Sequence, residues 1–282
     1  MNAPLLSAPR VEPFFFDADP GTRFSLYHAP APQVPARGAI LYVHPFAEEL
    51  NSSRRMAALQ ARRFAALGFA VLQLDLFGCG DSCGDFNAAR WDLWKRDLGT
   101  ARAWLAARSA GPLYVWGLRL GGLLALDFAA TAHVDGVILW QPFLQGRTCI
   151  NEFLHQFLRQ RLRTEAPGPG ARTTSALRAE LVARGAIEVG GYELVSPLVQ
   201  AIDACDAFDL VLPACPVHWF ASGAPGSARV AANAERLAER WAPHGVTLHC
   251  YPVDGVPFWT GQGAECPALL DATSAVFTLA AP

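Results

Sequence analysis

The stretch Gly117-Leu118-Arg119-Leu120-Gly121 decides the fold, through its own glycines and through what flanks it. An apolar run, residues 113–116, precedes it, and a run of helix-forming residues, 123–126, follows it. This order predicts a strand, a tight turn and a helix, the arrangement of the nucleophile elbow motif G-x-S-x-G. The two glycines permit the sharp turn that raises the central side chain off the strand, beside the N-terminus of the helix.

Arg119 stands at the centre of the motif, where Ser, Cys or Asp would attack a carbonyl or an alkyl carbon. A guanidinium stays protonated in proteins and is not a nucleophile, so no catalytic residue can be assigned here. Two interpretations stay open: a side chain that reaches water, or a cation at the floor of a pocket that pairs with a carboxylate or binds an anion. Because burying an unpaired guanidinium is costly, the second interpretation predicts a partner, Glu48 or Glu49, or else Asp81.

The composition limits the classes of protein to consider. With 282 residues and 52% hydrophobic content, the chain can bury one large core, as one domain with or without an insertion. A net charge of -2 gives no electrostatic reason to bind nucleic acid. Residues 1–13 lack the pattern of a secretory signal, and no apolar run reaches the roughly 20 residues of a transmembrane helix.

Seven scattered cysteines are typical of reduced thiols, so we expect a cytoplasmic protein without a disulfide framework. Cys79 and Cys83 flank one loop, but no second Cys or His pair accompanies them at the spacing of a zinc site. We therefore expect neither a metal nor a cofactor.

Apolar strand-like runs alternate with helical periodicity along most of the chain, which predicts a mostly parallel, doubly wound α/β sheet covered on both faces. Residues 14–16 and 24–27 predict an antiparallel hairpin at its N-terminal edge. The other expected strands are residues 39–43, 69–74, 113–116, 137–140, 217–221 and 248–251, and the expected helices are residues 54–67, 92–107, 228–241 and 268–279.

Residues 145–208 break this alternation with a helical pattern and no convincing strand. We expect one helix from about Asn151 to Arg163, a Pro/Gly-rich link at 166–170 and a second helix at 175–184. The chain then divides into an N-terminal part of the core, residues 1–144, a helical lid, 145–208, and a C-terminal part of the core, 209–282. Ligands of open α/β sheets bind at the carboxyl ends of the strands, so the lid is expected to cover that edge.

From about Arg23 onward the chain resembles the α/β-hydrolase superfamily, in the order of four segments: residues 43–49, 51–56, 75–82 and 116–122. More narrowly, these segments resemble the second type of hydrolase-like protein associated with the exosortase A system. The resemblance implies an α/β-hydrolase fold with a helical lid insertion. It also implies a link to bacterial gene clusters for exopolysaccharide production and the sorting of PEP-CTERM proteins.

The resemblance also implies places for the nucleophile, the acid and the histidine of a catalytic triad, and none of these places holds the expected residue. Arg119 is at the nucleophile position, and the two positions for the acid hold residues 222–227, without a carboxylate, and Gln141. The histidine loop, residues 253–259, contains no histidine, while His244 and His249 lie before or within the last strand. The triad is therefore expected to be degenerate.

The oxyanion region is better preserved, because His44-Pro45-Phe46 follows the third strand where a backbone N–H would face the pocket. Pro45 removes one donor, although Phe46 can still supply one, and His44 is expected to hold the loop. The residues expected in the pocket and oxyanion region are His44, Phe46, Glu48, Glu49, Arg119 and Leu120, with Ser82, Gln141, Phe258 and Trp259 as further candidates for its lining.

Two functions follow. The first is a non-catalytic protein that binds a small, anionic or neutral, molecule or a protein partner in an exosortase-linked pathway. The alternative is an active esterase, thioesterase or peptidase with non-standard catalytic residues. Ser82, Cys79 and Cys149 are the available nucleophiles, but the fold implied by the resemblance places no base beside any of them. The glycine-rich loop 78–84 is expected to be a tight connection, because it lacks the lysine of a phosphate-binding loop.

Overall fold

The computed structural model describes residues 10–164, 173–222, 228–261 and 264–278. Its centre is an eight-stranded sheet of order β1-β2-β4-β3-β5-β6-β9-β10, in which β1, β2 and β4 pair antiparallel and the other strands pair in parallel. The strands are β1 Val11–Asp17, β2 Thr22–His28, β3 Gly38–Val43, β4 Phe69–Leu74, β5 Leu113–Leu118, β6 Gly136–Trp140, β9 Pro216–Ser222 and β10 Thr247–Val253. The predicted mostly parallel sheet and its N-terminal edge hairpin are confirmed.

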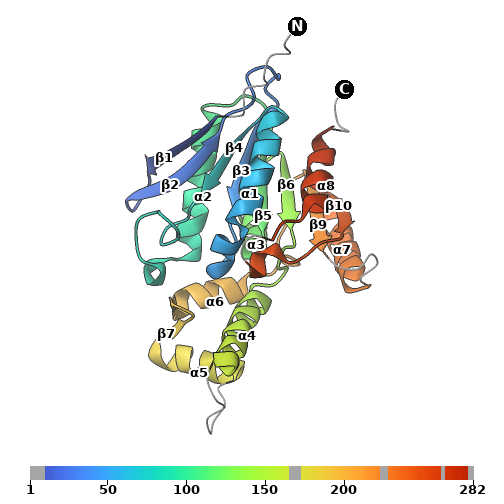
Figure 1. Cartoon of the computed structure of the whole chain (residues 1–282). Helices are drawn as coiled ribbons and strands as arrows, with labels where there is room; N and C mark the ends of the chain where they lie inside the picture. Colours follow the sequence, from blue (N-terminus) through green and yellow to red (C-terminus); the bar gives the residue numbers. More distant parts are fainter. Residues whose placement is uncertain (1–9, 165–172, 223–227, 262–263, 279–282) are drawn as a thin grey trace.

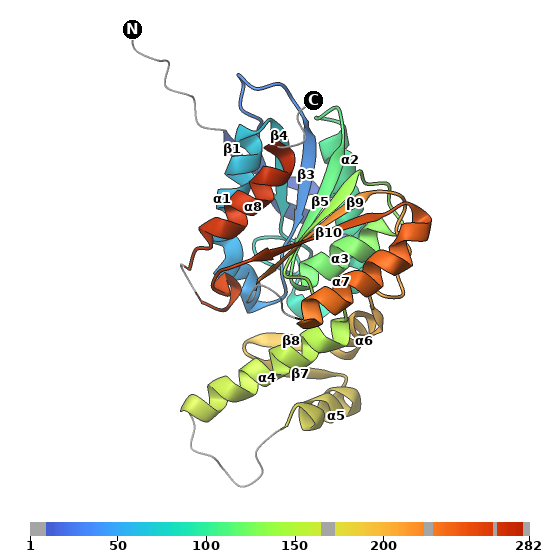
Figure 2. The same ribbon diagram turned by 90° about the vertical axis from the view of Figure 1, so that its right-hand side faces the viewer.

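Helices cover both faces of the sheet, as Figure 2 shows, with α1 and α8 on one face and α2, α3 and α7 on the other. The six residues of β3 are all buried, and this double cover explains why its sequence is a continuous apolar run. The helices of the core are α1 Glu48–Ala66, α2 Trp91–Ala106, α3 Leu120–Ala129, α7 Ala228–Trp241 and α8 Pro267–Thr278, with short 3-10 turns η1 Phe86–Ala88, η2 Ala242–His244 and η3 Phe258–Thr260.

The expected start of α1 near Arg54 was wrong, because the helix begins six residues earlier, at Glu48. Glu48 and Glu49 occupy its first turn, where negative charge stabilises the exposed N–H groups of the helix. The earlier start brings both glutamates to the carboxyl edge of the sheet.

In its described residues, 141–164 and 173–215, the insertion between β6 and β9 contains three helices and a hairpin. The expectation that it holds no strand was wrong, since two four-residue strands pair antiparallel around Gly190 and Gly191, which both have positive φ. The link at 166–170 lies outside the described residues. The elements of this lid are α4 Gly146–Thr164, α5 Thr174–Arg184, β7 Ala186–Val189, β8 Tyr192–Val195 and α6 Ser196–Ala204.

The lid lies at the carboxyl ends of the parallel strands, below the sheet in Figure 1. Arg178 of α5 holds its helices together: it donates to Asn151 of α4 at 2.7 Å and pairs with Asp203 of α6 at 2.6 Å. Asn87 donates to Glu193 of β8 at 2.6 Å, which connects the hairpin to the core. The lid is thus bound internally, and both polar and aromatic contacts attach it to the core.

The elbow between β5 and α3 leaves no room for side chains at its glycines. A Cβ on Gly121 would lie 2.4 Å from the carbonyl oxygens of Val43 and His44, and one on Gly117 would lie 2.3 Å from the Gly121 oxygen. Glycine therefore lets α3 approach the end of β3 closely, which sets the position of residue 119.

Gly121→Ala is expected to lower the free energy of unfolding by about 1–3 kcal/mol or more, because backbone atoms cannot move aside for the new methyl group. The matched control is Gly99→Ala in α2, where a Cβ meets nothing within 4 Å. That change should stabilise the helix by about 0.5–1 kcal/mol. Denaturant unfolding of both variants measures the difference, and equal effects would contradict the close approach at the elbow.

Candidate functional site

Arg119 has the backbone conformation of a nucleophile elbow, with φ 55° and ψ −119°. Its N–H donates to the Trp140 oxygen at 3.0 Å, and its carbonyl accepts from the N–H of Phe143 at 3.2 Å. A positive φ at a residue with a long side chain is strained, by roughly 1–3 kcal/mol, and persists where the surroundings impose it. The predicted elbow is present.

Other residues with strained, positive φ angles lie at the same edge of the sheet as Arg119. Within the described ranges, the non-glycine residues with positive φ are Ala47, Arg119 and Gln141, which follow β3, β5 and β6. All three lie at the carboxyl edge of the sheet, and such clusters mark functional sites. The backbone scaffold of an active site is therefore in place around Arg119.

The guanidinium of Arg119 lies between two carboxylates. Its Nε donates to Oε1 of Glu49 at 3.2 Å, and Nη2 donates to Oε1 of Glu152 at 2.5 Å. The ring of Phe143 is 4.0 Å from the guanidinium carbon and that of Trp259 is 5.0 Å away. Only 7% of the side chain is exposed. The interpretation of a side chain that reaches water was wrong, and the expected pair with Glu49 is present.

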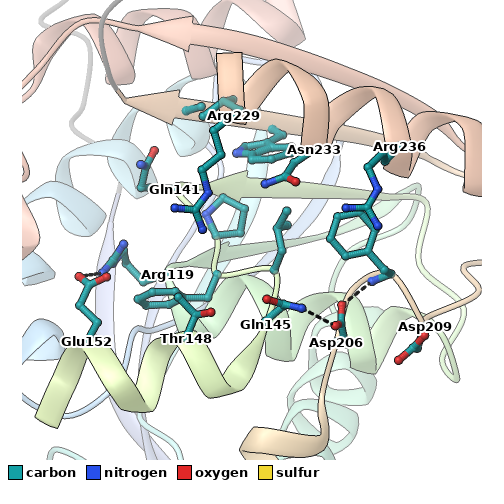
Figure 3. A pocket seen from close by; sticks show the side chains of 17 residues that line it. Arg119, Gln141, Gln145, Thr148, Glu152, Asp206, Asp209, Arg229, Asn233 and Arg236 are labelled. Carbon is teal, nitrogen blue, oxygen red and sulfur yellow. Dashed lines mark hydrogen bonds and ion pairs between the residues drawn. The ribbon is translucent and has the colours of Figure 1, made fainter. Parts of the chain in front are cut away.

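Glu152 is the residue that sequence reasoning missed. It lies on α4, at the part of the lid that contacts α3 (Figure 3). The sequence predicts the helix that carries Glu152, but nothing in the local pattern indicates which face of that helix meets the elbow.

Glu49 has an unusual ionisation. Burial opposes its charged form and raises its pKa to about 7, Arg119 offsets part of that effect, and the charge of Glu152 adds to it. One guanidinium thus faces two carboxylates, and a proton on Glu49 leaves the three groups neutral together. Oε2 of Glu49 is buried and accepts no hydrogen bond from the described residues.

Of the three alternative partners of Arg119, Glu49 is the one that pairs with it, and Glu48 and Asp81 have other contacts. Glu48 accepts hydrogen bonds from Tyr192 and Asn51, at 3.3 and 3.4 Å. Successive residues of a helix point about 100° apart, so Glu48 faces the lid hairpin while Glu49 faces the elbow. Asp81 lies in the loop after β4, where its N–H donates to the carboxylate of Asp75.

His44 is committed to its own loop. Its Nε2 accepts from the N–H of Leu76 at 3.2 Å, so Nδ1 carries the proton and donates to the Pro45 oxygen at 2.7 Å. Burial lowers the pKa of His44, which agrees with this neutral form. The side chain therefore holds the loop, as the sequence predicts, and is not placed to act as a base.

The oxyanion region is filled. His44, Phe46 and Leu120 border a recess of only about 10 Å³, which holds no more than a water molecule. The Phe46 ring contacts Phe153 of α4 edge to face, with centroids 5.3 Å apart. An aromatic contact between core and lid thus occupies the space beside the elbow.

The remaining histidines do not restore the triad. His218 and His249 stack on each other within β9 and β10, at 5.2 Å, and burial lowers the pKa of His218 to about 4. In the described part of the chain, no histidine forms a hydrogen bond or ion pair with Arg119. Phe258 and Trp259 occupy the histidine loop, and both are buried.

The candidate alternative nucleophiles are either hydrogen-bonded to backbone groups or buried. The hydroxyl of Ser82 accepts from the N–H of Phe24 at 2.9 Å and donates to the Asp75 oxygen at 2.5 Å. Ser82 therefore fastens the loop after β4 and does not line the pocket beside Arg119, contrary to expectation. Burial raises the pKa of the Cys79 and Cys149 thiols well above the ordinary value.

A cavity of about 590 Å³ opens beside Arg119, between the lid helix α4 and the core helix α7 (Figure 3). Of the residues expected in the pocket, Arg119 and Gln141 line it. Glu49 does not line it but is hydrogen-bonded to Arg119. Phe258 and Trp259 are not part of its wall. Its polar lining consists of Arg119, Gln141, Gln145, Thr148, Glu152, Asp206, Asp209, Arg229, Asn233 and Arg236.

Within the described residues, no three His, Cys, Asp or Glu side chains are arranged to hold a metal ion. No helix in the same ranges is both long and apolar enough to cross a bilayer.

Solved structures with this fold cover nearly the whole chain. Est1E from Butyrivibrio proteoclasticus, bound to ferulic acid, aligns with a TM-score of 0.66 and 16% identity over 94% of this chain and 98% of that one. An α/β serine hydrolase from Xanthomonas campestris, described as lacking a lid, aligns with a TM-score of 0.56 and 17% identity over 98% of this chain and 95% of that one. Mouse alpha/beta hydrolase domain-containing protein 10 aligns with a TM-score of 0.58 and 14% identity over 96% of this chain and 100% of that one. At such identities these likenesses show the fold alone.

Among curated protein sequences, none matches this chain. The model of the family described as serine aminopeptidase, S33, matches residues 34–246, which span the sheet from before β3 to the end of η2 and include the elbow and the lid. The chain therefore belongs to the serine aminopeptidase S33 family of α/β hydrolases.

Proposed function

We propose that this chain is a hydrolase-fold protein without triad chemistry, which binds a small polar molecule in the cavity beside Arg119. One observation carries the proposal: the side chain at the nucleophile position is a guanidinium held by Glu49 and Glu152. A buried cation with two carboxylate partners cannot attack an acyl carbon, and it occupies the space from which a serine hydroxyl would act.

The alternative, hydrolysis by non-standard residues, finds no support at the site. The Ser82 hydroxyl is committed to backbone groups, and the Cys79 and Cys149 thiols are buried with raised pKa values. An active cysteine needs the opposite, a lowered pKa and access to the substrate.

The cavity itself supports binding. Its volume of about 590 Å³ lies within the range of small-molecule sites, and it opens at the edge of the sheet where α/β proteins bind ligands. Polar side chains from the lid, from the loop after β6 and from α7 converge on it.

The resemblance of residues 43–49 and 75–82 to exosortase-associated proteins supports the pathway part of the proposal, in which the chain acts in exopolysaccharide production or PEP-CTERM protein sorting, in the cytoplasm. The proposed occupant of the cavity is a small molecule, and a protein of that pathway is the alternative partner.

The purified protein is expected to hydrolyse p-nitrophenyl esters no faster than background and to resist labelling by a fluorophosphonate probe. Arg119→Ser should not create activity, because no histidine lies in position to activate the new hydroxyl. Turnover that is lost on replacing Ser82, Cys79 or Cys149 by alanine would refute the proposal, as would strong activity of Arg119→Ser.

Arg119→Met should lower the free energy of unfolding by roughly 1–3 kcal/mol near neutral pH, because it leaves the buried carboxyl group of Glu49 without its hydrogen-bond donor. The control is Arg184→Met, which breaks an exposed pair with Glu180 on α5 and should cost less than about 1 kcal/mol. Denaturant unfolding compares the two, and a loss at Arg119 as small as the control would show that the ion cluster contributes little.

Glu49 should make stability depend on pH. Its pKa rises from 4.5 in the unfolded chain to about 7 in the folded protein, so the folded state binds the proton more tightly. Between these values stability must fall as pH rises, by up to about 3 kcal/mol at about 1.4 kcal/mol per pKa unit.

Glu49→Gln removes the titrating group and should remove this part of the slope. Unfolding of both proteins at a series of pH values between about 4.5 and 7.5 gives the comparison. Parallel pH profiles would show that Glu49 is fully ionised throughout.

A further inference from the structure

We propose that Arg229, and not Arg119, binds the ligand in this cavity, through a carboxylate or phosphate group of the molecule that enters it. This inference rests on the proposed function, in that the cavity is taken to be a binding site. It adds the chemical class of the ligand and the residue that recognises it.

Arg119 is already satisfied by the protein. Glu49 and Glu152 accept from its Nε and Nη2, and Phe143 and Trp259 lie against its guanidinium. A ligand anion at Arg119 would have to displace a carboxylate and then face it at close range, which like charges oppose. The cation that can accept an anion must therefore be another residue of the cavity wall.

Arg229 fits this role by its position. It lies in the first turn of α7 and extends into the cavity, at the same end as Arg119 and near Gln141 (Figure 3). Among the ion pairs of the described residues, none includes Arg229. The first turn of α7 has no acidic residue, and residues 222–227, which precede it, contain no Asp or Glu.

A cation in the first turn of a helix is at the unfavourable end, since the helix dipole already places positive potential there. The two positive features add at Arg229, so this end of the cavity favours an anion. Asn233, one helical turn later, lines the same cavity and offers an amide donor.

A second observation points to an acceptor at this site. Trp219, which also lines the cavity, is 4% exposed, and its buried indole N–H donates to no group of the described residues. An unsatisfied buried donor costs about 1–3 kcal/mol. Protein atoms cover this nitrogen, so an oxygen of a bound anion would supply the missing acceptor only after side chains of the cavity wall shift.

The carboxylates of the cavity are either paired with Arg119 or lie away from Arg229 (Figure 3). Glu152 is paired with Arg119, and Asp206 accepts from Gln145 at 2.8 Å and from the N–H of Phe208 at 2.9 Å. Asp209 is exposed and lies at the opposite end of the cavity from Arg229 (Figure 3). The anion therefore binds at the N-terminal end of α7.

The probes contain a phenyl ring because the cavity has an aromatic lining, which consists of Phe143, Phe208 and Trp219. Phenyl phosphate and phenylacetate each combine a ring with one of the two anionic groups, and phenol and phenylacetamide are their uncharged counterparts. Titration calorimetry or ligand-observed NMR on the full chain measures the dissociation constants, and the tighter of the two anions identifies the group that the site prefers.

Arg229→Gln should weaken binding of the preferred anion about tenfold and leave the uncharged counterparts unchanged. Arg240→Gln on the same helix is the control: it removes the same charge, lies outside this cavity, and should change affinity less than about twofold. Because both residues are exposed, both variants should unfold at the wild-type temperature.

Equal binding by Arg229→Gln and the wild type would overturn the inference, as would equal losses in both variants or no saturable binding of either anion to the wild type. Binding of an uncharged counterpart in the same cavity would then still support the proposed function. Ester turnover by the wild type would refute the proposed function whatever Arg229 does, so the two failures are distinguishable.

Discussion

The guanidinium of Arg119 between Glu49 and Glu152 joins three parts of the molecule that are far apart in the chain. Glu49 belongs to the first turn of α1, Arg119 to the elbow before α3, and Glu152 to the lid helix α4. A buried guanidinium must have partners, and each partner fixes the element that carries it. The position of the lid over the sheet edge and the shape of the cavity beside it both depend on this charge cluster.

The backbone of the elbow does not depend on the side chain at its centre. The strained turn is imposed by the backbone, through the close approach of Gly121 to β3 and the hydrogen bonds from Arg119 to Trp140 and Phe143. None of these depends on which side chain residue 119 carries. An arginine can therefore occupy the nucleophile position without any change in the backbone of the turn.

Much of the core could be predicted from the sequence, because buried parallel strands are continuous apolar runs and the G-x-x-x-G pattern marks the elbow. The start of α1 could not, since Asn51, Ser52 and Ser53 interrupt the apolar periodicity in what is in fact helix. The lid hairpin was not predicted, because its strands have only four residues each, although Gly190-Gly191 is a turn signal.

The candidate site was predictable in part. The pair of Arg119 with one of two adjacent glutamates follows from the elbow and the loop after β3, because both lie at the same edge of the sheet. Glu152 and Arg229 could not be found in this way. Each lies on a helix that the sequence predicts, but which face of a helix meets a cavity is decided by packing between elements distant in the chain.

The contacts of Arg178 with Asn151 and Asp203 have a mechanical consequence for the lid. Because they bind α4, α5 and α6 to one another, a displacement of α4 carries its neighbours along and separates Glu152 from Arg119. Glu49 is then the remaining carboxylate partner of Arg119, and the charge of Glu152, which helps to raise the pKa of Glu49, is farther away. The position of α4 and the proton affinity of Glu49 are thereby linked through one guanidinium.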